Sequence, residues 1–149
     1  MFIGSGKVWK TLIFYMRGPL MSNVKMVIVI DDSEAVRSKV GHWFKQREYS
    51  VVEAADGEEG YKKIKDNLNQ LTLIVSDYNM PKMNGGELLL KLDKEGLGID
   101  IVKVLLTTET PNKKTFDFTK IHNFRGWILK PINEKKFLKV MEALGFFKV

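Results

Sequence analysis

The sequence predicts an α/β fold in which helices cover both faces of a parallel sheet. Apolar runs of strand length alternate with segments of helical periodicity from Lys25 onward. Several runs are nearly continuous, which is typical of parallel strands buried on both faces. Polar side chains follow directly after most of these runs. Because open α/β sheets bind ligands beyond the carboxyl ends of their strands, this pattern predicts a functional site at one edge.

The central strand is expected at residues 71–75, an apolar run rich in β-branched residues. Asp77 stands where this run stops, and Pro81 with the stretch Asn84-Gly85-Gly86 forces a loop after it. An isolated aspartate in this position could simply cap the next helix. The residues that follow the other strands therefore decide whether Asp77 has a functional role.

The remaining elements follow in alternation. Further strands are expected at residues 26–30, 51–54, 101–106 and 127–129. Each strand is followed by an expected helix, and Ser33 is the candidate cap of the first one. The apolar positions that mark the five helices are Val36, Val40, Trp43 and Phe44; Tyr61, Ile64 and Leu68; Leu88, Leu89 and Leu92; Phe116 and Phe118, in a helix beginning near Pro111; and Phe137, Leu138 and Met141. Five strands and five helices imply right-handed crossovers between parallel strands.

The composition excludes several classes of protein. A length of 149 residues suggests one domain, and the absence of cysteine excludes disulfides, thiolate metal sites and cysteine nucleophiles. It also fits a reducing compartment, so we expect a cytoplasmic protein. The net charge of +6 is moderate and shows no basic stripe or nucleic-acid motif, so no nucleic-acid partner is expected.

Residues 1–22 form an N-terminal extension that differs from the rest of the chain. They carry three basic residues and no acidic one, and their larger apolar residues recur at helical spacing: Trp9, Leu12, Ile13 and Met16. One interpretation is an amphipathic helix on a membrane surface, and another is an extra helix docked on the domain. The segment is too short and interrupted to span a bilayer. We favour a third interpretation, in which Met21 is the natural start and the folded domain spans residues 23–149.

Polar residues at the strand ends suggest a common chemistry. In chain order they are Asp31 and Asp32, Asp77, Thr107 and Thr108, and Lys130 before Pro131. Three carboxylates at one edge would repel one another unless a cation lay between them. Oxygen ligands without nearby histidine or cysteine favour a hard ion such as Mg²⁺. A lysine and a hydroxyl beside a metal and a carboxylate are the groups that phosphoryl transfer requires, and an aspartate can be its nucleophile.

Four motifs resemble those of one family. They are Asp31-Asp32, the segment from Ser76-Asp77 through Asn84-Gly85, Leu106-Thr107-Thr108-Glu109, and Lys130-Pro131-Ile132. On these residues the sequence resembles the receiver domains of bacterial two-component response regulators, especially CheY-like chemotaxis regulators. The resemblance runs from about Val24 to the C-terminus. It implies a flavodoxin-like (βα)5 fold, with a five-stranded parallel sheet of order 2-1-3-4-5.

The resemblance also implies roles for the site residues. Asp77 would be the phosphoacceptor, supplied by the phosphohistidine of a sensor histidine kinase. Mg²⁺ would be held by Asp32, by Asp31 directly or through water, by Asp77, and by the backbone carbonyl of Asn79. Thr107 would donate its hydroxyl and Thr108 its amide to the phosphoryl group. Lys130 would pair with a phosphoryl oxygen, and the Lys130–Pro131 bond would be cis.

The resemblance further implies a switch at Trp127, which aligns with an aromatic residue that is usually tyrosine or phenylalanine. This ring would turn inward when Thr107 moves toward the phosphoryl group, changing the face formed by the fourth helix, the fifth strand and the fifth helix. Trp127 is bulkier than tyrosine. The segment His122 to Arg125 is also larger than usual on that face, and Asn84 replaces the usual aspartate before glycine.

Two signalling roles remain open, and both describe a monomeric phosphoacceptor protein and not an enzyme. A chemotaxis regulator would bind the flagellar motor switch protein. Asn79 and Glu109 match a pair associated in CheY with rapid autodephosphorylation. A phosphorelay shuttle would instead pass its phosphoryl group to a histidine phosphotransfer protein and hold it longer. A Mg²⁺-dependent aspartyl-phosphate hydrolase is a remote alternative, because it would require Asp-x-Asp where this chain has Asp77-Tyr78-Asn79.

Overall fold

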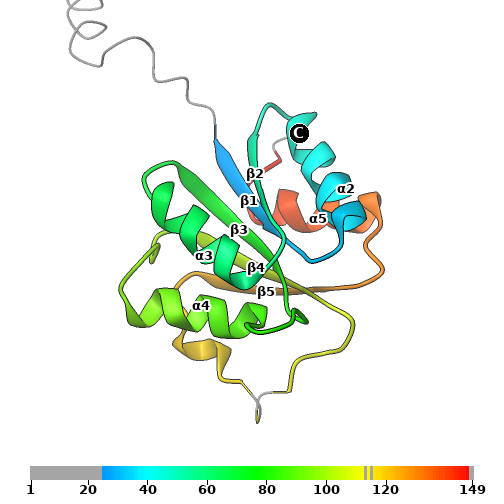
Figure 1. Ribbon diagram of the computed structural model, residues 1–149. Helices are drawn as coiled ribbons and strands as arrows, with labels where there is room; N and C mark the ends of the chain where they lie inside the picture. Colours follow the sequence, from blue (N-terminus) through cyan, green and yellow to red (C-terminus); the bar gives the residue numbers. More distant parts are fainter. Residues whose placement is uncertain (1–24, 113, 115, 148–149) are drawn as a thin grey trace, which may run out of the picture.

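A five-stranded parallel sheet lies between two layers of helices in the computed structural model (Figure 1). The structure describes residues 25–112, 114 and 116–147. The strands are β1 (Met26–Ile30), β2 (Ser50–Ala54), β3 (Leu71–Asp77), β4 (Val102–Thr107) and β5 (Phe124–Leu129). Their order is β2-β1-β3-β4-β5, and all neighbouring strands are parallel. This confirms the predicted α/β fold class and the order 2-1-3-4-5.

Helices α2 (Glu34–Lys45) and α5 (Glu134–Ala143) cover one face of the sheet, and α3 (Gly57–Asp66) and α4 (Gly85–Lys94) cover the other (Figure 1). On the first face, the rings of Phe44 and Phe137 pack edge to face, with centroids 5.6 Å apart. On the second, Ile64 and Leu89 are fully buried. The apolar residues of the central strands divide between these two cores, which explains their nearly continuous apolar runs.

Each α-helix in the described residues begins at a side-chain cap that accepts a hydrogen bond from the backbone of the first turn. The caps are Ser33, Asp56, Asn84 and Asn133. The predicted cap at Ser33 is therefore confirmed. Asn84 and Glu87 form a reciprocal capping box, which fixes the point where the loop after Asp77 enters α4.

The prediction of a helix between β4 and β5 is wrong for the described part of that segment. A loop leads instead to one 3-10 turn, η1 (Phe118–Lys120). The Asn112 side chain accepts from the backbone N–H of Lys114, and the Asp117 side chain accepts from that of Thr119. Such local bonds offer the backbone an alternative to a helix. Phe116 and Phe118 are also two residues apart, a spacing that does not place two side chains on one helix face.

The loop is held by its aromatic residues. The ring of Phe118 lies 4.6 Å from that of Phe116 and 4.8 Å from that of Phe124, measured between centroids. Phe116 also rests against α4 at Gly86, where an added Cβ would come within 3.1 Å of the ring. These aromatic residues belong to the apolar cluster on the face of the sheet that α3 and α4 cover.

A lysine lies buried near the amino end of β4. The Lys103 ammonium donates to the backbone carbonyls of Gly98, Ile101 and His122 at 2.7–2.8 Å, and the residue is fully buried. Gly98 and Ile101 precede β4, and His122 precedes β5. The side chain therefore joins the amino ends of the two strands at the edge opposite the predicted site.

Two sequence predictions concern the N-terminal extension and membranes. Within the described residues, no helix is both long and apolar enough to cross a bilayer. The start at Met21 and the alternative helical interpretations of residues 1–22 lie outside the described residues.

Candidate functional site

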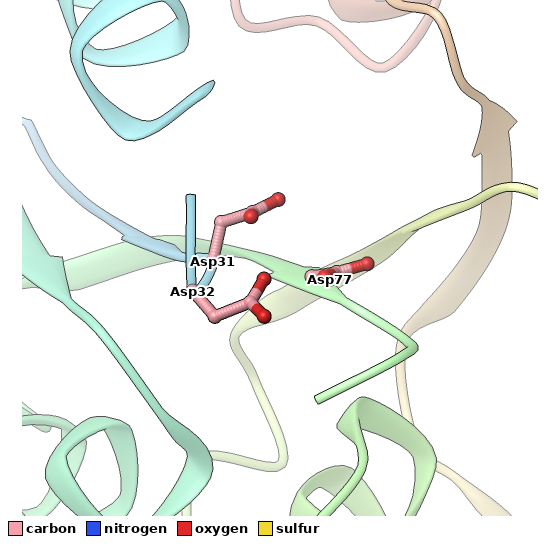
Figure 2. A group of neighbouring side chains, drawn as sticks. All are labelled: Asp31, Asp32 and Asp77. Atoms are coloured by element: carbon pink, nitrogen blue, oxygen red, sulfur yellow. The ribbon is translucent and has the colours of Figure 1, made fainter. Parts of the chain in front are cut away.

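Three carboxylates meet at the carboxyl edge of the sheet, as the sequence predicted (Figure 2). Asp31 and Asp32 directly follow β1, and Asp77 is the last residue of β3. The two strands pair with Ile30 opposite Ser76, so Asp31 and Asp77 leave the sheet side by side. One oxygen from each carboxylate lies within 4.8 Å of the others. Asp31 and Asp77 are buried, whereas Asp32 is exposed.

Lys130 lies between the two buried carboxylates. Its ammonium nitrogen is 2.9 Å from Asp31 Oδ2 and 3.3 Å from Asp77 Oδ1. Burial opposes the charge on Lys130, but the hydrogen bond to Asp31 and the attraction of both carboxylates outweigh it and raise the lysine pKa. The lysine therefore stays charged beside Asp77 at neutral pH.

Asp77 is in an environment that disfavours its ionised form. Burial, followed by the charge of Asp31, raises the pKa of Asp77 to about 6, although Lys130 partly offsets both effects. At neutral pH Asp77 is thus mostly ionised, and Lys130 only partly offsets the unfavourable effects of burial and of the Asp31 charge. An additional cation at this edge would lower the electrostatic free energy of the site.

The two threonines at the end of β4, Thr107 and Thr108, differ in exposure and partners. Thr107 is buried, and its hydroxyl donates to the Glu109 carbonyl at 2.8 Å. Thr108 is exposed, and its hydroxyl accepts from the side-chain amide of Asn79 at 3.2 Å. The backbone N–H of Asn79 also donates to Asp77 Oδ1 at 3.3 Å. Asn79 therefore connects the carboxylate edge with the end of β4, a contact that the sequence did not predict.

The backbone around Lys130 is held to β4. The N–H of Lys130 donates to the Thr107 carbonyl at 2.8 Å, and the Lys130–Pro131 bond is cis, as the resemblance implied. The loop that follows β5 thus presents the lysine beside Thr107 and the carboxylates.

Trp127 lies in β5, away from the carboxylates. It is half-buried and packs on the face of the sheet that α3 and α4 cover. Its ring centroid is 5.9 Å from that of Phe118, which in turn lies 6.4 Å from the Tyr78 ring. The residue predicted as a switch is therefore connected by aromatic packing to the residue that follows Asp77.

The donor set fits the predicted cation. All three side chains that the structure brings together are carboxylates, which are the ligands that hard ions such as Mg²⁺ prefer. Asp32 is exposed and so remains accessible to a partly hydrated ion. The contribution of the Asn79 carbonyl stays a prediction.

Two contacts that hold Asp31 were missed by sequence reasoning. The backbone N–H of Ser33 donates to Asp31 Oδ1 at 2.9 Å, and Arg37 Nη1 donates to the Asp31 carbonyl at 2.6 Å. The only signal for Arg37 in the sequence is its position one helical turn beyond the cap Ser33. A side chain that binds a backbone carbonyl leaves no pattern of residue types.

Comparison with known proteins points to one family. A family model described as the response regulator receiver domain matches residues 27–142. Chemotaxis protein CheY1 of Helicobacter pylori is 28% identical over 119 residues, which cover 79% of this chain and 94% of that protein. The structure of chemotaxis protein CheY4 of Vibrio cholerae superimposes with a TM-score of 0.70 at 32% identity, covering 80% of this chain and 98% of the other.

A further similarity covers part of a longer protein. Chemotaxis protein CheV3 of Helicobacter pylori is 38% identical over 77 residues, which cover 46% of this chain. The match spans 25% of CheV3, so this chain corresponds to about a quarter of that relative. The family model, in contrast, covers most of the present chain. This chain therefore belongs to the response regulator receiver domains, and to their CheY type.

Proposed function

We propose that this receiver domain accepts a phosphoryl group on Asp77 and, in that state, controls a protein partner in chemotaxis. The observation that carries the proposal is the environment of Asp77. Lys130 Nζ lies 3.3 Å from its carboxylate, and Asp31 and Asp32 each bring a carboxylate oxygen within 4.8 Å. Such an arrangement neutralises incoming negative charge while leaving one carboxylate as nucleophile.

In the proposed reaction, an Asp77 oxygen attacks the phosphorus of a phosphohistidine on a sensor kinase. The P–O bond forms as the P–N bond breaks, and the histidine leaves as a neutral imidazole after taking a proton. Asp31, Asp32, Asp77 and the Asn79 carbonyl would hold Mg²⁺, which neutralises phosphoryl charge when bound. Lys130 would pair with a phosphoryl oxygen, and Thr108 would donate its backbone N–H. Hydrolysis of the acyl phosphate then restores Asp77.

The signal would leave the site through Thr107. Its hydroxyl now donates to the Glu109 carbonyl and would exchange this acceptor for a phosphoryl oxygen. That movement would open space toward β5 and allow the Trp127 ring to turn inward. Because no α-helix forms between β4 and β5 in the described residues, the responsive face would consist of the loop with η1, β5 and α5.

Similarity to two chemotaxis proteins over most of the chain supports a flagellar motor switch protein as the partner. A histidine phosphotransfer protein is the alternative. Asn79 and Glu109 favour the first role, since the resemblance associates this pair with rapid loss of the phosphoryl group. We place this signalling in the cytoplasm.

Incubation with acetyl phosphate or phosphoramidate and Mg²⁺ tests the acceptor. We expect one base-labile phosphoryl group on the wild-type protein, detected by mass spectrometry, and none on the Asp77→Asn variant, because an amide is not a nucleophile. Asp93→Asn is a matched control that changes an aspartate outside the site and should still be labelled. A wild-type protein that stays unlabelled would refute the proposal. The decay rate of the phosphoryl group then separates a rapidly reset regulator from a longer-lived shuttle.

A further inference from the structure

The backbone of Asp31 is fixed from two sides. Its N–H donates to the Ala54 carbonyl at the end of β2 at 3.1 Å, and its carbonyl accepts from Arg37 Nη1 in α2 at 2.6 Å. The carbonyl of Asp31 belongs to the peptide that joins Asp31 to Asp32. The orientation of this peptide limits the directions of the Asp32 Cα–Cβ bond, from which the exposed carboxylate extends. The bond from Arg37 therefore restrains Asp32 without touching it.

Arg37 is itself anchored. Its Nε lies 3.6 Å from Glu53 Oε1, and the Arg37 side chain is only 16% exposed. The backbone carbonyl of Glu53 accepts from Lys63 of α3 at 2.6 Å. The guanidinium thus spans from β2 to the end of β1, in a cleft lined by residues of α2, the end of β2 and α3. Its planar set of donors allows simultaneous contacts with a carbonyl and a carboxylate, which a single ammonium cannot reproduce.

We propose that Arg37 is a positioning residue that holds the Asp31–Asp32 peptide so that Asp32 can bind the Mg²⁺ of the proposed function, on which this inference rests. Side chains that orient metal ligands typically change metal affinity by about 10- to 100-fold when they are removed. For this chain we expect Arg37→Met to weaken Mg²⁺ binding by about tenfold.

If Arg37 acted only through its charge, its removal would strengthen Mg²⁺ binding, so the direction of the change distinguishes the two roles. Removal of a positive charge near a cation site strengthens cation binding when charge alone matters. A positioning role requires that Arg37→Met weaken it. Lys45→Gln is the matched control, because it removes one positive charge from the exposed end of the same helix, about eight residues or 12 Å farther along. This variant should bind Mg²⁺ as the wild type does.

The free energy of unfolding, measured in urea with the full chain at increasing Mg²⁺ concentration, separates affinity from structure. Its value in EDTA reports any loss of stability, and the Mg²⁺ concentration at which it begins to rise reports the dissociation constant. We expect the rise to begin at about tenfold higher Mg²⁺ for Arg37→Met, and at an intermediate concentration for Arg37→Lys, which can still donate to the carbonyl.

Binding by Arg37→Met that is equal to or tighter than that of the wild type would overturn the inference. Should this variant fail to fold, Arg37→Lys decides, because it keeps the charge but loses the planar donors that contact the carbonyl and Glu53 together. Wild-type affinity in Arg37→Lys would then overturn the inference. A wild-type protein whose stability does not respond to Mg²⁺ would instead refute the cation site of the proposed function.

Discussion

Replacement of Asp77 by asparagine should stabilise the Mg²⁺-free protein at neutral pH. Asp77 is 3% exposed, and its pKa is raised from 3.8 to about 6, first by burial and then by the charge of Asp31. The folded state therefore binds a proton more tightly than the unfolded state does. It follows that stability falls as the pH rises from about 4 to about 6, and the full penalty is present above that range.

The magnitude follows from this difference in pKa. A pKa difference of one corresponds to about 1.4 kcal/mol, so the rise of about two in the pKa of Asp77 lowers the free energy of unfolding by about 3 kcal/mol at neutral pH. Asparagine has nearly the same shape and retains an oxygen that can accept from the Asn79 N–H, but it loses the attraction to Lys130. We therefore expect Asp77→Asn to raise the free energy of unfolding by about 1–3 kcal/mol at pH 7.5.

Urea unfolding in EDTA between pH 4 and pH 8 measures this difference. The two proteins should converge toward the acidic end, where Asp77 is protonated in the folded state and increasingly protonated in the unfolded state. Asp93→Asn provides a control of opposite sign, because hydrogen bonds from His122 outweigh burial and hold the pKa of Asp93 below its usual value. Removal of Asp93 should therefore lower stability at pH 7.5. An Asp77→Asn variant less stable than the wild type at that pH would refute the reasoning.

Two further predictions concern the cation and the switch. Mg²⁺ at ten times its dissociation constant should stabilise the wild type by about 1.4 kcal/mol in thermal or urea unfolding. Asp32→Ala should lose most of this effect, and an unchanged wild-type midpoint at millimolar Mg²⁺ would exclude the cluster as a cation site. Beryllofluoride with Mg²⁺ should shift the fluorescence of Trp127 to the blue, with the other two tryptophans replaced by phenylalanine, because the ring becomes more buried. An equal shift in Thr107→Ala would show that the ring does not respond to this hydroxyl.

The candidate site could be predicted because its residues lie at the ends of strands. Asp31, Asp77 and Thr107 each follow a recognisable apolar run, and parallel pairing brings these run ends to one edge whatever the details of packing. The helix after β4 was not predictable in this way. Two aromatic residues and Pro111 suggested it, but the side chains of Asn112 and Asp117 stabilise a looped backbone there.

Hydrogen bonds from side chains to backbone carbonyls could not be predicted from the sequence, because every residue has a carbonyl. Arg37 and Lys103 are ordinary charged residues in the sequence, and only the folded chain shows which carbonyls they reach. Lys103 even interrupts the apolar run that predicted β4. Its burial is possible because three carbonyls replace water around the ammonium.

The carbonyl cage around Lys103 also determines how β4 aligns with its neighbours. A slip of β4 by one residue would turn the ammonium to the opposite face of the sheet, among the apolar side chains beneath α2 and α5. The free energy of burying an unpaired charge there makes such a slip prohibitive. Thr107 lies four residues farther along the same strand and on the same face. Lys103 thus fixes the register of β4 from its amino end. This register determines where Thr107, at the other end of the strand, lies relative to Asp77.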